Sequence, residues 1–314
     1  MASGRFTVDI GPPEYNPNSG PYTFVQKAVK IDADAGFRDL HLTQTEGIVI
    51  ALDWVAKDRH HLWGSAVMVA PGVALSAIHV IDAMRNNGFL AGQGGELWAI
   101  SFHADRVEHW RVDSFSKDQE KGDLCLLTLV RSTAPSVPSA GIPLKFGLAR
   151  MAARVPCVGE TISLIGFRAT KEFFEHGADM GLSLFGSVGL VTERYPTGRE
   201  RCLLPNPAIE VNACTKGGMS GGAAFDAKGH LIGVISTGLD EGPSFVSLSW
   251  PAIPVPIVPK WPASIMPAET SLGAMATDGW CGIEHLERVH VGTKDGVLMA
   301  SLSDPDNGQD SNPP

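Results

Sequence analysis

The stretch CTKGGMSGGAAFDAKGHLIGVIS, residues 214–236, places one serine, Ser220, between two glycine pairs. The segments AAFD and HLIGVIS that follow flank the turn sequence DAKG, and this pattern predicts a β-hairpin. Glycine adopts positive φ and lets another backbone approach closely, so the chain can turn sharply around the serine. The amides of Gly218 and Ser220 can then converge on one small concavity, as the donors of an oxyanion hole do. Taken alone, the motif fits an ordinary glycine-rich loop equally well.

A histidine lies upstream, at the end of an apolar run. In GSAVMVAPGVALSAIHVID, residues 64–82, two apolar runs flank a Pro-Gly turn, and the pattern predicts a hairpin. His79 follows the second run, where the strand gives way to a short helical turn. An isolated histidine in such a place is more often a structural residue bonded to a backbone carbonyl than a catalytic base.

An aspartate lies between these two motifs. Asp123 directly precedes an apolar run in EKGDLCLLTLV, residues 120–130, and alone it fits a solvated turn residue at the start of a strand. Together, however, His79, Asp123 and Ser220 supply a base, an orienter for that base and a nucleophile, which amide hydrolysis requires. The combination predicts a catalytic site where each residue alone does not.

From about residue 46 the chain consists of short β-rich runs separated by turn residues, such as GIVIALDWV, ELWAISFHA, ETISLIGF and SFVSLSW. Short, evenly spaced strands predict an all-β protein, here with two lobes of about six strands each. The predicted units are an N-terminal extension 1–42, a domain 43–250 with barrels at about 43–134 and 144–250, a proline-rich extension 251–302 and a disordered tail 303–314. The stretch PSVPSAGIP, 135–143, is the predicted linker between the barrels.

Composition and charge argue against several classes of protein. The net charge of −9 and the pI near 5.5 do not favour nucleic acid or an anionic membrane as a partner, because both attract clustered Lys and Arg. No apolar run approaches the ~18 residues of a membrane span, and the N-terminus lacks the pattern of a signal peptide. The five cysteines are scattered and include no CxxC pair, so neither disulfides nor a zinc site is expected. We therefore expect a cytoplasmic protein without cofactor or metal.

The three motifs together resemble those of the trypsin-like (chymotrypsin-fold) serine peptidases, and most closely the bacterial peptidase domains of the HtrA/Deg type. GSAVMVAPGVALSAIHVI is similar to the histidine block of that family, GDLCLLTL to its aspartate block and AIEVNACTKGGMSGGAAFDAKGHLIGVIS to its serine block. The resemblance covers residues 46–250 and implies two six-stranded antiparallel β-barrels with the active site between them. No PDZ domain is recognisable after residue 250.

The resemblance implies a serine endopeptidase and gives each matching residue a role. Ser220 is the nucleophile, His79 the general base, and Asp123 the group that orients the base. The amides of Gly218 and Ser220 form the oxyanion hole. The expected partner is a protein or peptide substrate.

The resemblance also implies a set of substrate-binding residues. They are Cys214, Thr215, Ser236, Thr237, Gly238 and Ser244. Ser236 matches a serine that supports the aspartate, and the edge at Thr237 and Gly238 pairs with the substrate main chain. Cys214 stands where an aspartate would select Lys or Arg, so we expect non-tryptic specificity. Together with Ser244 on the pocket wall, it favours a neutral, small to medium apolar residue before the cut.

Two departures from the family pattern bear on regulation and compartment. Met219 replaces the aspartate that pairs with a newly cut N-terminus in zymogen-activated members, so activation by such a cut is not expected. Val80 stands where secreted members often have a disulfide cysteine, which agrees with a reducing compartment. A regulatory protein or the two extensions would then gate the activity.

Alternative hypotheses remain open from the sequence. GMSGG also matches the nucleophile elbow of α/β-hydrolases, for which Asp278 with His285 or His290 would be the partners, although the elbow requires a helix after the serine. A catalytically silent binding scaffold is the alternative from another functional class.

Four further histidines have simple explanations. His60 and His61 have no acidic or cysteine cluster to complete a metal site. His103 and His109 in SFHADRVEHW fit a solvated face of one strand.

Overall fold

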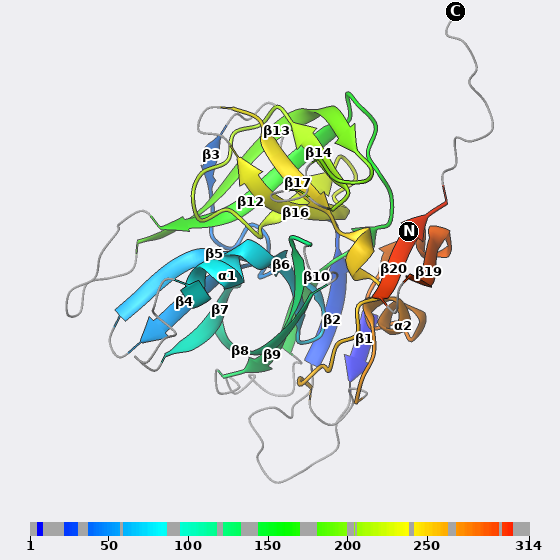
Figure 1. Cartoon of the computed structure of the whole chain (residues 1–314). Coiled ribbons are helices and arrows are strands. Elements are labelled where there is room, and N and C mark those ends of the chain that lie inside the picture. Colours follow the sequence, from blue (N-terminus) through cyan, green and yellow to red (C-terminus); the bar gives the residue numbers. More distant parts are fainter. Residues whose placement is uncertain are drawn as a thin grey trace, which may run out of the picture.

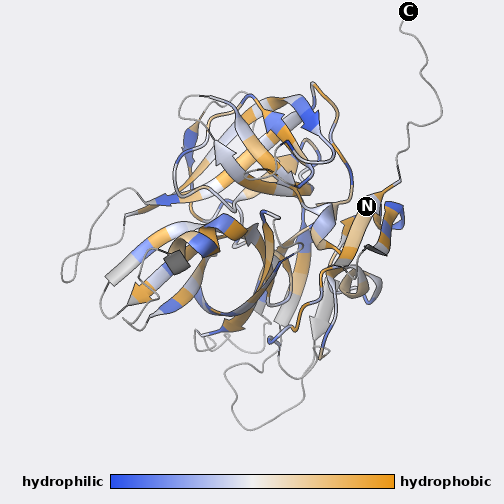
Figure 2. Cartoon of the chain, viewed as in Figure 1, coloured by the Kyte–Doolittle hydropathy of each residue, from blue (hydrophilic) through white to orange (hydrophobic). Residues whose placement is uncertain are grey.

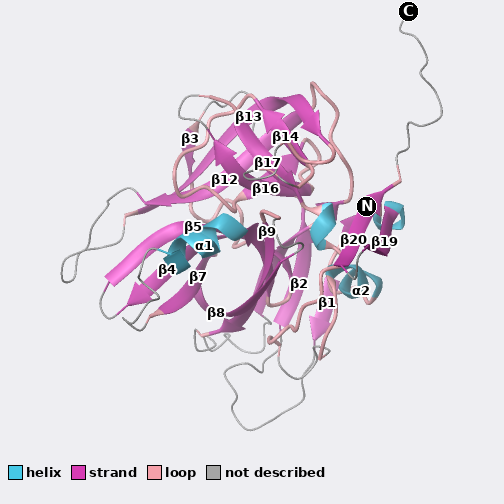
Figure 3. Ribbon diagram, viewed as in Figure 1, coloured by secondary structure: helices cyan, strands magenta, loops and turns pink. Residues whose placement is uncertain are grey.

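The structure is a computed structural model in which two β-barrels lie side by side and further strands run along one flank (Figure 1). It describes residues 5–8, 22–30, 37–56, 59–86, 95–117, 122–132, 144–169, 181–199, 204, 206–238, 242–262, 268–294 and 297–303. The predicted linker 135–143 lies outside these residues, as does the predicted tail after Ser303. Strands dominate the described chain, and the helices are few and short (Figure 3).

The first barrel is a closed ring of antiparallel strands in the order β4-β5-β6-β9-β8-β7. Its strands are β4 (Val49–Ala56), β5 (Arg59–Ala70), β6 (Val73–Ala77), β7 (Glu96–Phe102), β8 (Val107–Lys117) and β9 (Leu124–Arg131). β6 is buried along its whole length and β9 almost so. Their continuous apolar sequences, VALSA and LCLLTLVR, lack the alternation of a half-exposed strand, which explains this burial.

The second barrel is formed by six strands that are consecutive in the chain but pair in a different order. They are β12 (Thr161–Ala169), β13 (Leu182–Tyr195), β14 (Ala208–Val211), β15 (Ala223–Asp226), β16 (Leu231–Gly238) and β17 (Ser244–Leu248). Antiparallel pairing runs from β12 through β13, β14, β17, β16 and β15, and β15 returns to β12. The predicted all-β fold class with two six-stranded antiparallel barrels, chymotrypsin-like in arrangement, is confirmed.

One hydrophobic core extends through both barrels. Hydrophobic stretches run along the strands of each barrel in Figure 2. The helical elements of the described residues are α1 (Ile78–Asn86), α2 (Leu272–Thr277) and the 3₁₀ turns η2 (Trp250–Ala252) and η3 (Leu286–Arg288). Among the described residues, no helix has the length and apolar character that crossing a membrane requires.

The N-terminal extension contributes strands to two different sheets. β2 (Tyr22–Lys27) pairs antiparallel with β1 (Arg5–Val8) and parallel with β10 (Leu144–Ala149). β3 (Arg38–Leu40) adds to β13 of the second barrel. The sequence places the start of the second barrel near residue 144, but β10 belongs to the β1-β2-β10 sheet, and the ring begins at β12. The reason is that β10 finds its partner in the N-terminal extension, which is remote in sequence.

The C-terminal extension also returns to the barrels. β18 (Ile283–Glu284) pairs with β11 (Met151–Ala152), which in turn pairs with β16, and both pairings are parallel. β19 (Val289–Lys294) and β20 (Val297–Leu302) form a separate hairpin. The proline-rich run 251–262 suggests an extended surface segment, yet its apolar residues are largely buried. Large apolar side chains alternate with its prolines, and they pack onto the core.

An aromatic junction (Phe24, Trp110, Phe146 and Trp261) ties these segments to the first barrel. Trp261 is fully buried, and its ring centroid lies 4.9 Å from that of Trp110 and 5.3 Å from that of Phe146. Phe24 meets the same indole edge-on at 5.6 Å. The four rings come from β2, β8, β10 and the proline-rich run. Such aromatic pairs each contribute about 0.5–1.5 kcal/mol beyond their buried area.

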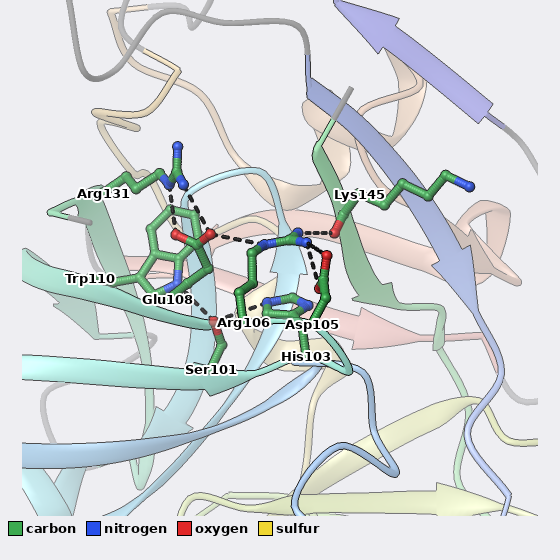
Figure 4. Close-up of polar contacts among 8 residues, drawn as sticks. All are labelled: Ser101, His103, Asp105, Arg106, Glu108, Trp110, Arg131 and Lys145. Atoms are coloured by element: carbon green, nitrogen blue, oxygen red, sulfur yellow. Dashed lines mark hydrogen bonds and ion pairs between the residues drawn. The ribbon is translucent and has the colours of Figure 1, made fainter. Parts of the chain in front are cut away.

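A buried ion network (Arg106, Glu108 and Arg131) lies beside this junction (Figure 4). Arg131 donates to Glu108 Oε2 at 2.8 Å through Nε and to Oε1 at 2.9 Å through Nη2. Arg106 donates to the same carboxylate at 2.9 Å and to the carbonyl of Lys145 on β10 at 2.9 Å. The network therefore fastens β10, and with it the N-terminal strand, to the first barrel.

Candidate active site

The ends of two neighbouring strands bring His79 and Asp123 together. Ala77 on β6 is paired with Leu124 on β9, so the residues just beyond this pair are close in space. His79 lies in the first turn of α1, which follows β6 directly. The amide of Ile78 donates to the Asp123 carbonyl at 3.1 Å and fixes the junction between strand and helix.

The Asp123 carboxylate accepts three hydrogen bonds. The Nδ1 atom of His79 lies 2.8 Å from Oδ1, and the His79 amide donates to the same oxygen at 3.2 Å. The hydroxyl of Ser236 donates to Oδ2. With its proton on Nδ1, the imidazole keeps the lone pair of Nε2 as an acceptor. Asp123 is buried, whereas the His79 side chain is 45% exposed, so the ring has an anchored side and an open side.

Ser220 lies at the entrance of the β15–β16 hairpin. The Gly221 amide donates to the Ile235 carbonyl at 2.7 Å, and the Ile235 amide donates to Gly222 at 2.8 Å. The Ser220 hydroxyl donates to the carbonyl of Ser236 at 3.3 Å. In the described part of the chain it makes no hydrogen bond to His79; without substrate, catalytic hydrogen bonds are often long or misaligned.

Ser236 is thus the residue that touches both halves of the candidate triad. Its hydroxyl contacts Asp123, and its carbonyl contacts Ser220. The structure therefore brings together the four residues that the sequence singled out in widely separated segments.

A tight turn precedes the serine and orients the two candidate oxyanion amides. The Met219 amide donates to the Lys216 carbonyl at 3.1 Å, and Gly218 has a φ of +93°, which is typical of the third position of a type II turn. A Cβ at Gly218 would also lie 3.1 Å from the Phe167 carbonyl oxygen. Within the described residues, the amides of Gly218 and Ser220 donate to no other group. Both remain free for a developing oxyanion.

Three of the expected specificity residues, Thr215, Gly238 and Ser244, lie together. Thr215 Oγ1 lies 2.8 Å from Ser244 Oγ, and the Ser244 hydroxyl donates to the Ala213 carbonyl at 2.7 Å. A Cβ at Gly238 would lie only 2.2 Å from Thr215 Oγ1. Cys214 is partly buried, and its carbonyl accepts a hydrogen bond from Ser187 at 2.6 Å.

The edge predicted to receive the substrate main chain is the end of β16. Thr237 and Gly238 pair with β17 on one side, after a register shift that begins at Ile235. On the other side, the pairing of β16 with β15 ends at Val234 in the described chain. The last residues of β16 therefore offer a strand edge beside the serine.

The α/β-hydrolase alternative is wrong for this chain. Ser220 is followed by the β15–β16 hairpin, where a nucleophile elbow requires a helix. The three residues proposed for that alternative lie in the C-terminal extension instead. Asp278 follows α2, His285 precedes η3, and His290 is on β19.

The histidines suspected of sharing one strand face do not share a strand. His103 lies in the turn after β7, and its amide donates to the Arg106 carbonyl at 2.9 Å, whereas His109 is on β8. A hairpin turn thus falls between them. The described residues contain no group of three or more metal-ligating side chains, and the side chain of His60 lies outside the described part.

Two buried serines of the first barrel were not recognised from sequence as part of the site. Ser65 on β5 and Ser76 on β6 are fully buried. The Ser65 hydroxyl donates to the Gly218 carbonyl, and the Ser76 hydroxyl donates to the Ser65 carbonyl. The available signal was weak: each is a hydroxyl in an otherwise apolar strand.

Comparisons with known proteins find one family match and similar solved structures. A family model described as "Trypsin-like peptidase domain" matches residues 64–234. A search among curated proteins finds no significant match. Similar solved chains include the active form of the Rv3671c protease from M. tuberculosis, at 16% identity and a TM-score of 0.41, over 66% of this chain and 78% of that chain. Deg5 is similar at 18% identity and a TM-score of 0.41, over 65% of this chain and 85% of that chain.

Proposed function

Because the chain belongs to the trypsin-like peptidase family, we propose that it is a serine endopeptidase that cleaves protein substrates through an acyl-enzyme on Ser220. One observation carries the proposal: Ser236 contacts both the buried carboxylate that holds the His79 imidazole and the hydroxyl of Ser220, whose loop has two amides without an acceptor among the described residues. A binding scaffold has no physical need for this combination.

Acylation uses His79 first as a base and then as an acid. Ser220 Oγ attacks the scissile carbonyl carbon while Nε2 of His79 takes the hydroxyl proton. The tetrahedral intermediate then breaks its C–N bond, and His79 returns the proton to the leaving amine. Asp123 keeps the ring in the required tautomer and stabilises the imidazolium that forms in between.

Deacylation repeats the cycle with water. Water attacks the ester carbon and gives a proton to His79, and the C–Oγ bond breaks as His79 returns the proton to Ser220. The products are a peptide carboxylate and the free enzyme.

The amides of Gly218 and Ser220 stabilise the negative charge on the carbonyl oxygen in both tetrahedral intermediates. Removal of one such donor typically lowers kcat by about 10²–10³. The positive φ at Gly218 supports this role, because the turn that directs its amide favours glycine at this position.

We propose further that the residue before the cut is neutral and small to medium in size. The hydroxyls of Thr215 and Ser244 and the thiol of Cys214 carry no charge to pair with Lys or Arg. A Cβ at position 238 would lie only 2.2 Å from Thr215 Oγ1, so Gly238 and Thr215 approach each other closely beside Ser244. A cleavage profile on a peptide library that is dominated by Arg or Lys would contradict this preference.

Regulation, in this proposal, does not use a newly cut N-terminus. Met219 is fully buried against Gly166, and a thioether cannot pair with an ammonium group as a carboxylate does. The described parts of the extensions leave His79 45% exposed. A regulatory protein acting at the exposed side of His79 is therefore the form of gating that we propose. Cys157, Cys214 and Cys281 form no disulfide in the described chain, which supports a reducing, cytoplasmic location.

The test is covalent labelling of the purified full chain with a fluorophosphonate probe. We expect labelling of the wild type, loss of labelling in Ser220→Ala, and retention in Ser249→Ala, which removes another buried hydroxyl outside the site. No labelling of the wild type under any condition would favour the silent scaffold. Labelling that requires an added partner would support the gated enzyme.

A further inference from the structure

Ser65 lies at the interface between the two barrels, with every polar group engaged. Its hydroxyl accepts a hydrogen bond from the Phe167 amide at 2.8 Å and donates to the Gly218 carbonyl at 3.2 Å. Its amide donates to the Ser220 carbonyl at 2.8 Å, and its carbonyl accepts from Ser76 at 2.8 Å. Three of these four contacts cross from the first barrel to the second.

The two carbonyls that Ser65 holds belong to Gly218 and Ser220, the residues whose amides are the candidate oxyanion donors. The peptide between Gly218 and Met219 is thereby fixed at both ends: its carbonyl by Ser65 and its amide by the Lys216 carbonyl. The backbone of Gly217 and Gly218 is easily rotated, because glycine has access to both signs of φ. In the described chain, no other side chain hydrogen-bonds to the backbone of residues 217–220.

The catalytic groups are divided between the barrels. His79 and Asp123 come from the first barrel, whereas Ser220 and both amides come from the second. Catalysis needs these groups within a fraction of an ångström of their working geometry. Ser65, a buried residue of the first barrel, holds two carbonyls of the serine loop and so fixes that loop relative to the first barrel.

We propose that Ser65 is a positioning residue for the oxyanion hole: its hydroxyl fixes the Gly218 carbonyl, and thereby the orientation of the residue whose amide is a candidate oxyanion donor. The proposal rests on the peptidase function proposed above. Ser65 touches neither substrate nor reacting atoms, so its removal acts on the stabilisation of the oxyanion and not on substrate binding.

The test compares Ser65→Ala with the wild type on a peptide that the wild type cleaves. We expect kcat to fall about 10- to 100-fold, less than the 10²–10³ for loss of a donor itself, with KM within about twofold. Affinity for a peptide aldehyde, whose adduct carries an oxyanion, should fall in parallel with kcat/KM. Affinity for the same peptide ending in an alcohol should not change.

Ser249→Ala is the matched control, because Ser249 is also fully buried and donates to one carbonyl, that of Ile232 at 3.1 Å, away from the site. Its melting temperature should fall as in Ser65→Ala while its kcat stays at the wild-type value. If Ser65→Ala does not fold, Ser65→Cys replaces it, because a thiol keeps a weak donor in a similar volume. We then expect an intermediate kcat.

A wild-type kcat in Ser65→Ala, or in Ser65→Cys where that variant is used, would overturn the proposal, as would equal losses of affinity for the aldehyde and the alcohol. A wild type that neither cleaves peptides nor reacts with fluorophosphonate would instead overturn the proposed peptidase function. The two failures are therefore distinguishable.

Discussion

Two of the carboxylates that the first barrel buries, Asp123 and Glu108, have opposite kinds of partner. Glu108 is 1% exposed and lies between two guanidinium groups, those of Arg131 and Arg106. Asp123 is 5% exposed and accepts from a hydroxyl, a backbone amide and the imidazole of His79. One carboxylate is neutralised by fixed cations; the other has only neutral donors and a ring that can gain charge.

This difference separates a structural site from a reactive one. The charge of Glu108 is balanced at all times, so the network resists any change in it. The charge of Asp123 is balanced fully only when His79 becomes an imidazolium, which is the state that the proposed mechanism creates. The same barrel therefore stabilises the N-terminal junction with one carboxylate and, in the proposed mechanism, favours proton transfer with the other.

Asp123→Asn should produce the largest effect, and it should act on catalysis alone. In a Ser-His-Asp triad this replacement lowers kcat about 10⁴-fold, because the amide favours the wrong imidazole tautomer. The measurement is kcat for a cleaved peptide together with the melting temperature, which should change little. Asp113→Asn, at the exposed pair with Arg111, is the control and should leave kcat unchanged. Equal activity in both variants would contradict the assigned role of Asp123.

Glu108→Gln should have the opposite profile. It removes the carboxylate that the buried Arg131 guanidinium contacts, which typically costs about 3–5 kcal/mol of unfolding free energy, whereas Arg106 keeps Asp105 as a partner. Denaturant unfolding measures this loss, and kcat per folded molecule should stay near the wild-type value. Replacing both partners, with Glu108→Leu and Arg131→Met, should cost less than the single change. A single variant as stable as the wild type would show that the network does not stabilise the fold.

The smallest expected effect is a pH dependence of the unfolding free energy. It is caused by His103, which lies near Arg106 of the Glu108 network. Burial, followed by the positive charge of Arg106, lowers the pKa of His103 from 6.5 to about 4. Between pH 6.5 and about 4, the His103 imidazole is therefore protonated in the unfolded chain and neutral in the folded chain. The contribution to stability is complete above pH 6.5 and falls as the pH drops towards 4. The loss is of the order of 3 kcal/mol.

Unfolding free energies measured between pH 7 and pH 4 test this expectation. His103→Gln should flatten the dependence in that window. Burial lowers the pKa of His61 as well, so His61 contributes with the same sign. An identical pH profile in wild type and His103→Gln would remove His103 as the cause.

Much of the site could be predicted because its signals are local. Ser220 lies among glycines that the turn requires, His79 follows an apolar run, and Asp123 precedes one. Ser65 could not be predicted in this way. A serine in the strand GSAVMVA looks like a tolerated polar residue until its partners, Phe167 and Gly218, are known.

The sequence by itself determined the two-barrel architecture and the candidate triad, because alternating or continuous apolar strands and glycine turns act over short distances. Only the tertiary structure decided the place of the extensions. The parallel pairing of β2 with β10 and the burial of Trp261 depend on segments far apart in the chain. Prolines at 251–262 suggest a surface path, but the burial of the large apolar side chains between them outweighs that preference.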